Sequence, residues 1–316
     1  MGIYAELYKG IGLDKIIGKY FPEPGSARGN EANKYIYPLT LMFIGGGKYI
    51  EDIEKIAADE GLKKICKIDK APTPTAYGDW IGDEDKKEHI KRLSKRILKR
   101  AKEEGFTLDI DASGIEAEKR HALYAYLGYK GYMPMLGLIP EPGWSIGYEF
   151  REGNIPPAAE NYEFTKRQVE LVKESGKKIL RFRGDSAAYQ AELVNYLDKE
   201  GISYTITVVK DVLVKETIQQ IPETKWKGLK NKKGQPRGRE YTEFIQSMDD
   251  TDKAFRVIML RRHNPKYDLF GNEPGYCYHG IAANYLNGEK AGEQAAEWRN
   301  GRGNLENYNE GSKGWF

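Results

Sequence analysis

The stretch FTLDIDAS, residues 106–113, has the composition of a short buried strand in which two aspartates are set. Successive side chains of a strand point to opposite faces, so Asp109 and Asp111 share one face. Ionised carboxylates are costly to bury unless they are paired or bound to metal. The stretch is therefore either an edge strand with its acids in solvent or a buried strand that carries a polar site, and Ser113 completes an Asp-x-Ser arrangement after Asp111.

The pattern after this strand alternates between strands and helices. Turn residues and apolar runs predict strands at 131–141, 143–154, 177–187 and 202–210, and helices at 160–176 and 187–201. The order is three strands, helix, strand, helix, strand. This order predicts an α/β fold, a mixed sheet with helices on its faces, over residues 105–209.

The chain on either side of this core has a different character. Residues 1–104 carry apolar residues at helical spacing and end in the charged stretch DEDKKEHIKRLSKRILKRAKEEG, which has a narrow apolar stripe. Short helices joined by glycine turns fit a helix-turn-helix DNA reader or an ordinary helical bundle, and the pattern leaves both open. Residues 210–285 predict a β-rich insertion that includes the basic segment NKKGQPRGRE, and residues 286–316 begin a further helix.

Composition limits the function classes only weakly. Lys and Arg number 50 against 47 Asp and Glu, so the net charge of +3 fits a solvated surface as well as a polyanionic partner. The two cysteines are far apart and the four histidines have no metal-ligand spacing, which argues against a disulfide framework or a zinc site. No apolar run is long enough for a signal core or a membrane span, so we expect a cytoplasmic protein that does not enter the membrane.

Two further acids could join Asp111 in a site. Asp185 follows an apolar strand at its carboxyl end, where ligand sites gather in α/β sheets, although it could equally cap the next helix. Glu306, a helical glutamate, would by itself be a surface residue. Three carboxylates from two strands and a late helix can converge at one sheet edge, and oxygen ligands of this kind bind Mg²⁺ or Mn²⁺. Two such ions, about 3.5–4 Å apart, support phosphoryl displacement.

The end of the chain carries a spaced motif. Arg302, Glu306 and Lys313 stand at the spacings of the signature Tyr, two residues, Arg, three residues, Glu, six residues, Lys, with Arg299 at the Tyr position. With Asp111-Ala112-Ser113 in place of Asp-x-Thr, the sequence resembles the DDE transposases of bacterial insertion sequences. Several other stretches resemble this family: GYKGYMPMLG, FREGN, FRGDSAAYQ, IGGGKYIEDIEKI and PTPTAYGDW.

The resemblance implies a ribonuclease H-like catalytic core with a β-strand insertion before the last acid. It implies that Asp111, Asp185 and Glu306 hold two Mg²⁺ or Mn²⁺ ions for strand cleavage and 3′-OH strand transfer. It also implies phosphate contacts by Arg302 and Lys313; Trp298 could stack on a base or belong to the core. The expected partners are double-stranded DNA, as terminal inverted repeats and target, and a second copy of the chain on DNA, near the nucleoid.

Two other functions stay open at this point. The chain ends at Phe316, three residues after Lys313, and related enzymes continue with more helix, so we expect a truncated catalytic helix. One alternative is therefore a truncated, non-catalytic DNA-binding relative that represses transposition. The other is a different ribonuclease H-like nuclease that acts on junctions or RNA–DNA hybrids.

Overall fold

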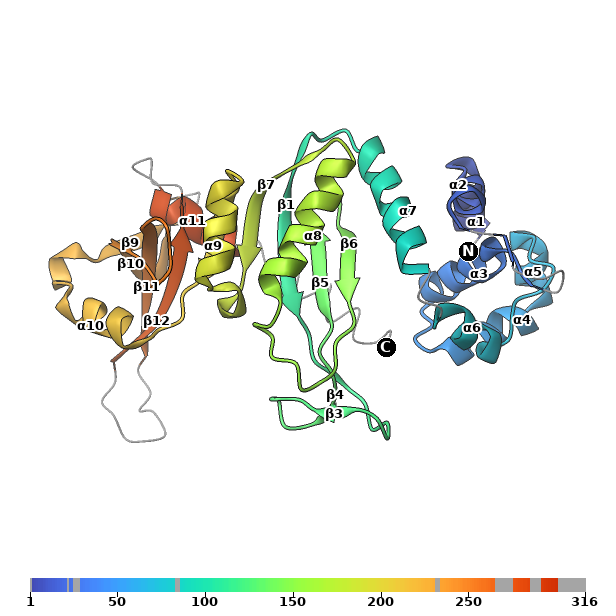
Figure 1. Ribbon diagram of the computed structural model, residues 1–316, viewed down its shortest axis with the longest axis horizontal. Coiled ribbons are helices and arrows are strands. Elements are labelled where there is room, and N and C mark those ends of the chain that lie inside the picture. Colours follow the sequence, from blue (N-terminus) through green and yellow to red (C-terminus); the bar gives the residue numbers. More distant parts are fainter. Residues whose placement is uncertain are drawn as a thin grey trace. The chain divides into compact units, whose positions relative to one another are not determined.

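The computed structural model describes residues 2–21, 23–24, 29–82, 86–230, 234–264, 275–284 and 291–300 (Figure 1). The described residues form two compact units, the first up to residue 102 and the second from residue 103. Each unit has its own core. None of the helices described is both long and apolar enough to cross a bilayer.

The first unit is helical. Its helices are α1 (Gly2–Gly10), α2 (Leu13–Tyr20), α3 (Ala32–Ile44), α4 (Ile53–Ala58), α5 (Glu60–Cys66), α6 (Pro74–Ile81) and α7 (Lys86–Arg100), with a 3₁₀ turn η1 (Ile50–Asp52). Local chemistry sets several ends: Thr73 caps α6 through the Ala76 amide, and Pro74 occupies its first turn. Tyr77 is fully buried and donates from its hydroxyl to the Tyr35 carbonyl at 2.9 Å, which ties α6 to α3.

The second unit is built on a nine-stranded sheet with the order β6-β5-β1-β7-β8-β12-β11-β10-β9. β1 (Gly105–Ala112) is parallel to β7 (Lys178–Gly184), which is parallel to β8 (Ser203–Thr207). β5 (Met135–Ile139) and β6 (Trp144–Glu149) continue the sheet in antiparallel fashion on the other side of β1. Taken in chain order, the first five long strands have the spatial order 3-2-1-4-5. This is the predicted ribonuclease H-like mixed sheet, and the fold class is confirmed.

Two helices cover one face of this core. α8 (Asn161–Glu174) leads into β7 and α9 (Ala191–Lys199) leads into β8. The connection through α8 runs from β6 past β5 and β1 to β7, and the connection through α9 joins the neighbouring strands β7 and β8. Both connections run in the same direction across the sheet, and right-handed connections then place both helices on one face, as Figure 1 shows. Gly137 in β5 lies against Phe164 and Gln168 of α8, where an added Cβ would come within 3.4 Å of either side chain. Because Gly137 pairs with Ile110, that strand residue also faces α8.

The described strands of the predicted β-rich insertion extend the core sheet. After α10 (Val212–Gln220) and a 3₁₀ turn η3 (Glu223–Lys225) come β9 (Lys227–Lys230), β10 (Pro236–Gln246), β11 (Phe255–Asn264) and β12 (Gly275–Ala283). β12 pairs with β8 in antiparallel fashion, with Ala282 opposite Ile206. The basic segment NKKGQPRGRE is partly strand: β10 begins at Pro236, where a ladder hydrogen bond is not yet needed, and shifts register before Glu240.

A small second sheet was not predicted. β2 (Ile115–Glu116), β4 (Lys130–Tyr132) and β3 (Leu123–Tyr124) pair in that order between β1 and β5. Gly131 allows the close approach, because an added Cβ would lie 1.9 Å from the Ile115 carbonyl oxygen. Strands of two or three residues are too short to show alternation, so the sequence pattern could not reveal them.

Candidate active site

Asp111 lies at the end of β1, on the face away from α8. Ile110 faces α8, and neighbouring residues of a strand point to opposite sides, so Asp109 and Asp111 face the other way. Asp111 is half-buried, and its carboxylate accepts from the Ser113 hydroxyl at 3.4 Å. Ser113 is itself held by its amide, which donates to the Pro134 carbonyl. Asp111 thus lies at a strand end that is hydrogen-bonded, through Ser113, to the loop before β5.

Asp185 follows β7 at the neighbouring position. The parallel register pairs Asp109 with Arg183, so two residues further on each strand Asp111 and Asp185 stand at adjacent strand ends. Asp185 is half-buried and caps the short 3₁₀ turn η2 (Ser186–Ala188), with its Oδ1 accepting from the Ala187 amide at 2.9 Å. A carboxylate has about four acceptor positions, so this cap is compatible with metal binding.

The helix expected at 187–201 starts later than the pattern indicates. η2 is followed by Gln190 in an extended conformation, and α9 begins only at Ala191. Asp185 therefore caps η2 and not α9. At this interruption between η2 and α9, Gln190 donates from Nε2 to the carbonyls of Ala158 and Ala187, which holds the loop after β7 in place.

Asp109 is used by the fold itself. Its carboxylate receives two hydrogen bonds from Arg183, from Nε at 2.6 Å and from Nη2 at 2.5 Å. The side chains are 1% and 5% exposed, so this is a buried, bidentate ion pair between β1 and β7. The pairing accounts for one of the two aspartates of the LDID stretch and favours Asp111 as the acid that serves a site. Sequence reasoning missed Arg183, because only the strand register shows that it stands opposite Asp109.

Of the predicted site residues near the end of the chain, the structure describes only Trp298. Glu306, Arg302 and Lys313, predicted as an acid and two phosphate contacts, lie outside the described residues. Trp298 is half-buried in α11 (Ala291–Asn300). Its carbonyl accepts from Arg183 Nη1 at 3.0 Å, and its ring centre is 5.9 Å from the guanidinium carbon. In this environment Trp298 packs beside the buried ion pair; base stacking by this residue stays a prediction.

The loops at these strand ends are held together by residues that sequence reasoning quoted only as part of a motif. Arg151 of FREGN is 5% exposed and donates from Nε to the Met133 carbonyl at 2.9 Å and from Nη1 to the Ala159 carbonyl at 2.8 Å. Burial lowers the pKa of Arg151 from its ordinary value, but guanidinium stays charged at any working pH. Asn161 extends the bracing, since its Nδ2 donates to the Ala187 carbonyl beside Asp185.

The donor chemistry of Asp111 and Asp185 fits a hard divalent cation. Both are carboxylates at one sheet edge, and Mg²⁺ and Mn²⁺ prefer oxygen ligands. Within the described ranges, no group of three or more His, Cys, Asp or Glu is gathered closely enough to hold a metal ion. A complete ligand set therefore needs a contribution from outside these ranges, and Glu306 is the predicted source.

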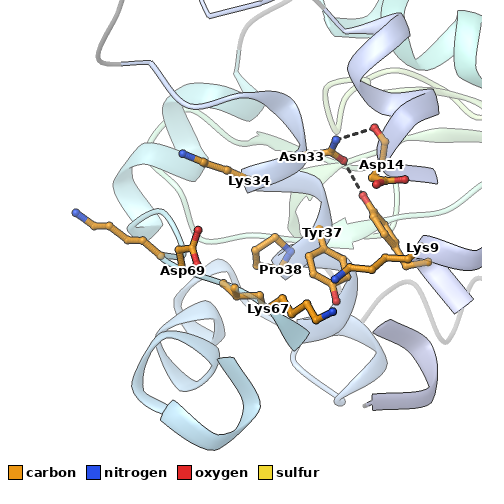
Figure 2. A pocket seen from close by; sticks show the side chains of 11 residues that line it. Lys9, Asp14, Asn33, Lys34, Tyr37, Pro38, Lys67 and Asp69 are labelled. Atoms are coloured by element: carbon orange, nitrogen blue, oxygen red, sulfur yellow. Dashed lines mark hydrogen bonds between the residues drawn. The ribbon is translucent and has the colours of Figure 1, made fainter. Parts of the chain in front are cut away.

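A separate pocket of about 200 Å³ lies in the helical unit (Figure 2). Its rim carries several lysines, and the dashed lines in Figure 2 follow the hydrogen bonds of Asn33 with the Tyr8 hydroxyl and the Asp14 carbonyl. Burial raises the pKa of Tyr37 to about 12, so this phenol stays neutral and donates to the Cys66 carbonyl. These contacts join α1, α2, α3 and α5, so we interpret the pocket as a feature of helix packing.

A ribonuclease H-like sheet with acidic residues at the ends of its first and fourth strands is the architecture of the DDE transposase class. The family comparison agrees: residues 31–308 match the family model described as transposase DDE domain group 1. The match covers most of the chain, and the protein belongs to this family. The matched range includes Asp111, Asp185 and Glu306. No curated protein matches the sequence.

Comparison with solved structures gives distant similarities. The piggyBac transposase, in a synaptic complex with hairpin DNA, has 13% identity and a TM-score of 0.45 over 96% of this chain and 66% of its own. The Mos1 transposase in a paired-end complex with the left transposon end has 11% identity, a TM-score of 0.25 and coverage of 61% and 64%. The Mos1 mariner paired-end complex with Mn has 12% identity, a TM-score of 0.24 and coverage of 64% and 65%. The chain thus spans just under two thirds of the length of each of these proteins.

Proposed function

We propose that this protein is a DNA transposase that cleaves the ends of an insertion sequence and joins the freed 3′-OH to target DNA. The observation that carries the proposal is the position of Asp111 and Asp185 at adjacent ends of β1 and β7, within a chain that belongs to a transposase family. The third acid is Glu306. The cofactor is Mg²⁺ or Mn²⁺, as two ions.

The residues divide the chemistry as follows. Bound metal ions would stabilise the attacking and leaving oxygens of an in-line phosphoryl displacement. Asp111 and Asp185 would hold them from the two strand ends, with Ser113 orienting the Asp111 carboxylate and the Ala187 amide fixing one oxygen of Asp185. Arg302 and Lys313 would bind phosphates of the cleaved strand, Arg as a bidentate fork and Lys as a point charge.

The helical unit supplies a second DNA contact in this proposal. The α7 sequence KKEHIKRLSKRILKR holds eight basic residues and one acidic residue. Lys91, Arg92 and Lys99 are exposed, while Leu98 on the same helix is 1% exposed and anchors it. A helix with this charge fits the phosphate backbone, whose neutralisation dominates DNA affinity. The substrates would be double-stranded DNA, as terminal inverted repeats and target, bound by a dimer of the chain at the nucleoid.

The test is a nicking and strand-transfer assay on DNA that carries the element's ends, with Mg²⁺ or Mn²⁺. Asp111→Asn and Asp185→Asn should each lower product formation roughly 10³-fold or more, since the metal ions supply several kcal/mol of transition-state stabilisation. Asp249→Asn, at an exposed turn between β10 and β11, is the matched control and should stay at the wild-type rate. Undiminished strand transfer by Asp185→Asn would overturn the assignment.

One observation favours a second function. The signature's Tyr position is occupied by Arg299, which removes one element of the family pattern. A non-catalytic DNA-binding relative that represses transposition would bind element ends tightly and leave them uncut at every metal concentration. A different ribonuclease H-like nuclease would cut junctions or RNA–DNA hybrids and give no joined product. The same assay therefore separates the three functions.

A further inference from the structure

The buried ion pair between Asp109 and Arg183 has a third member. Of its five N–H donors, Arg183 gives two to Asp109, and a third, on Nη1, goes to the main-chain carbonyl of Trp298 in α11. A buried ion pair is stable only when its remaining hydrogen-bonding groups are also satisfied. The α11 carbonyl therefore satisfies a third donor of Arg183 and joins α11 to the ion pair.

The geometry places this contact immediately behind the candidate site. Asp111 and Asp185 are each two residues beyond the paired residues, Asp111 at the end of β1 and Asp185 directly after β7. Trp298 stands eight residues before Glu306 in the sequence. Arg183 is thus two residues before Asp185 in the chain, and its guanidinium is hydrogen-bonded to β1 two residues before Asp111 and to α11 eight residues before Glu306.

The rest of α11 is held elsewhere. Ala295 and Ala296 are buried against the insertion strands, in a cluster with Leu229, Tyr241, Ile258, Leu260, Ile281 and Ala283. Glu297 forms an ion pair with Arg237 of β10 at 3.3 Å. The earlier part of α11 is therefore anchored on the insertion strands, and Arg183 carries its contact with the core strands β1 and β7.

We propose that Arg183 is a positioning residue that fastens the end of α11 to β1 and β7, next to the strand ends that carry Asp111 and Asp185. The proposal rests on the proposed function for its catalytic consequence, but the fastening itself can be tested without catalysis. Lysine could not substitute, because its single ammonium lacks the planar fork that serves Asp109 and Trp298 together.

The test uses the double variant Asp109→Leu/Arg183→Met, which removes both buried charges and so avoids leaving either one unpaired. In the full-length protein, hydrogen exchange should show protection of residues 295–300 falling about tenfold, a local opening, while α8 and β8 keep wild-type protection. In the DNA assay kcat should fall about 10²-fold, as for a misplaced catalytic group. The single variant Arg183→Lys should show the same two losses, in the protection of residues 295–300 and in kcat.

Arg237→Gln is the matched control, because it removes the exposed ion pair of α11 and leaves the Arg183 contact in place. It should keep wild-type protection of residues 295–300 and wild-type kcat. Wild-type protection of α11 in the double variant would overturn the proposal, as would an equal loss of protection in α8 and β8, which would indicate a general role in the core. If the wild-type protein does not cut DNA, the proposed function fails, and the exchange measurement still decides whether Arg183 fastens α11.

Discussion

Asp109 and Asp111 are two residues apart on one face of β1, and their surroundings separate their roles. Asp109 is 1% exposed and its charge is balanced by the Arg183 guanidinium. Asp111 is half-buried at the strand end and is oriented by a neutral hydroxyl. A carboxylate already balanced by a buried cation gains little from a metal ion, so the pairing of Asp109 supports Asp111 as the candidate ligand.

The first prediction concerns the stability of this pair. Arg183→Met leaves the Asp109 charge buried without its partner and should lower the free energy of unfolding by about 3–5 kcal/mol. The double variant Asp109→Leu/Arg183→Met should recover most of that loss, because neither charge remains. Urea denaturation of the wild type, both single variants and the double variant measures the coupling. Additive losses in the double variant would contradict a paired role.

Arg261 forms a second charged cluster, in the insertion strands. Its guanidinium carbon lies 4.2 Å from the Trp226 ring centre and 4.1 Å from that of Tyr276, and it pairs with Glu223 and Glu240. The hydrogen bond from Arg261 lowers the pKa of Glu223 from its ordinary value of 4.5. A carboxyl whose pKa is depressed in the folded state stabilises the protein above its unfolded pKa and loses that contribution as the pH falls through the folded pKa.

The second prediction follows from the lowered pKa of Glu223. Glu223→Gln should lower the Tm of the protein at neutral pH. The difference from wild type should begin to shrink as the pH falls below 4.5, where the unfolded chain takes up a proton, and should vanish once the pH is below the depressed pKa of the folded state. Thermal melts followed by circular dichroism at a series of pH values measure it. Glu216→Gln, an exposed glutamate of α10, is the control. A Tm difference that stays constant with pH would refute the linkage.

At the scale of single elements, the backbones of the small second sheet (β2, β4 and β3) approach each other closely at two glycines. Gly131 of β4 lies against the Ile115 carbonyl of β2, and Gly153 lies against the carbonyls of Gly131 and Leu123. The neighbours are backbone atoms, which cannot rotate away as a side-chain end can. Glycine at these positions is therefore required by the packing of the small sheet.

The third prediction tests this requirement. Gly131→Ala should lower the free energy of unfolding by about 1–3 kcal/mol, the usual range for overpacking. The denaturation midpoint in guanidinium chloride measures the effect. Gly228→Ala in β9 is the control, since an added Cβ there meets no atom within 4 Å. Equal midpoints for the two variants would mean that the small sheet adjusts at no cost.

The α7 helix carries the fourth prediction, which belongs to the proposed function. Lys91→Gln/Arg92→Gln/Lys99→Gln should weaken DNA binding and flatten the dependence of log K on log salt by about 0.9 for each lost phosphate contact. The effect should be the same for specific and unrelated DNA, because phosphate contacts do not read sequence. A charge-matched variant, Lys15→Gln/Lys19→Gln/Lys215→Gln, should leave the slope unchanged. A similar slope change in both variants would indicate net charge alone.

The whole molecule is organised as two units with separate hydrophobic cores. The clusters around Tyr77 and around Ile17 lie entirely in the helical unit, and the cluster around Ile258 lies in the second. Chains built this way need not unfold in one step, because each core supports its own cooperative transition. Stability changes should therefore stay within the unit where they are made.

The fifth prediction is that Tyr77→Ala lowers only one of two thermal transitions. Tyr77 is fully buried, and large aromatic truncations cost about 3–5 kcal/mol. Calorimetry should show a lower Tm for the helical unit and an unchanged Tm for the unit that contains the nine-stranded sheet. Val257→Ala in the second unit is the reciprocal control, because Val257 is also fully buried. A single transition that shifts in both variants would mean that the units unfold together.

The sequence by itself determined the α/β class, the order of the core elements and the positions of Asp111 in one strand and Asp185 just after another, because hydrophobic periodicity and turn residues are local properties. It also carried the spaced motif that predicts Glu306, whose place in the site is still a prediction. The tertiary structure decided the strand register, which pairs Asp109 with Arg183 and assigns the two aspartates different surroundings. It also decided that the insertion extends the core sheet and that α11 reaches Arg183, because pairings between residues 74 to 115 positions apart leave no mark in a local pattern.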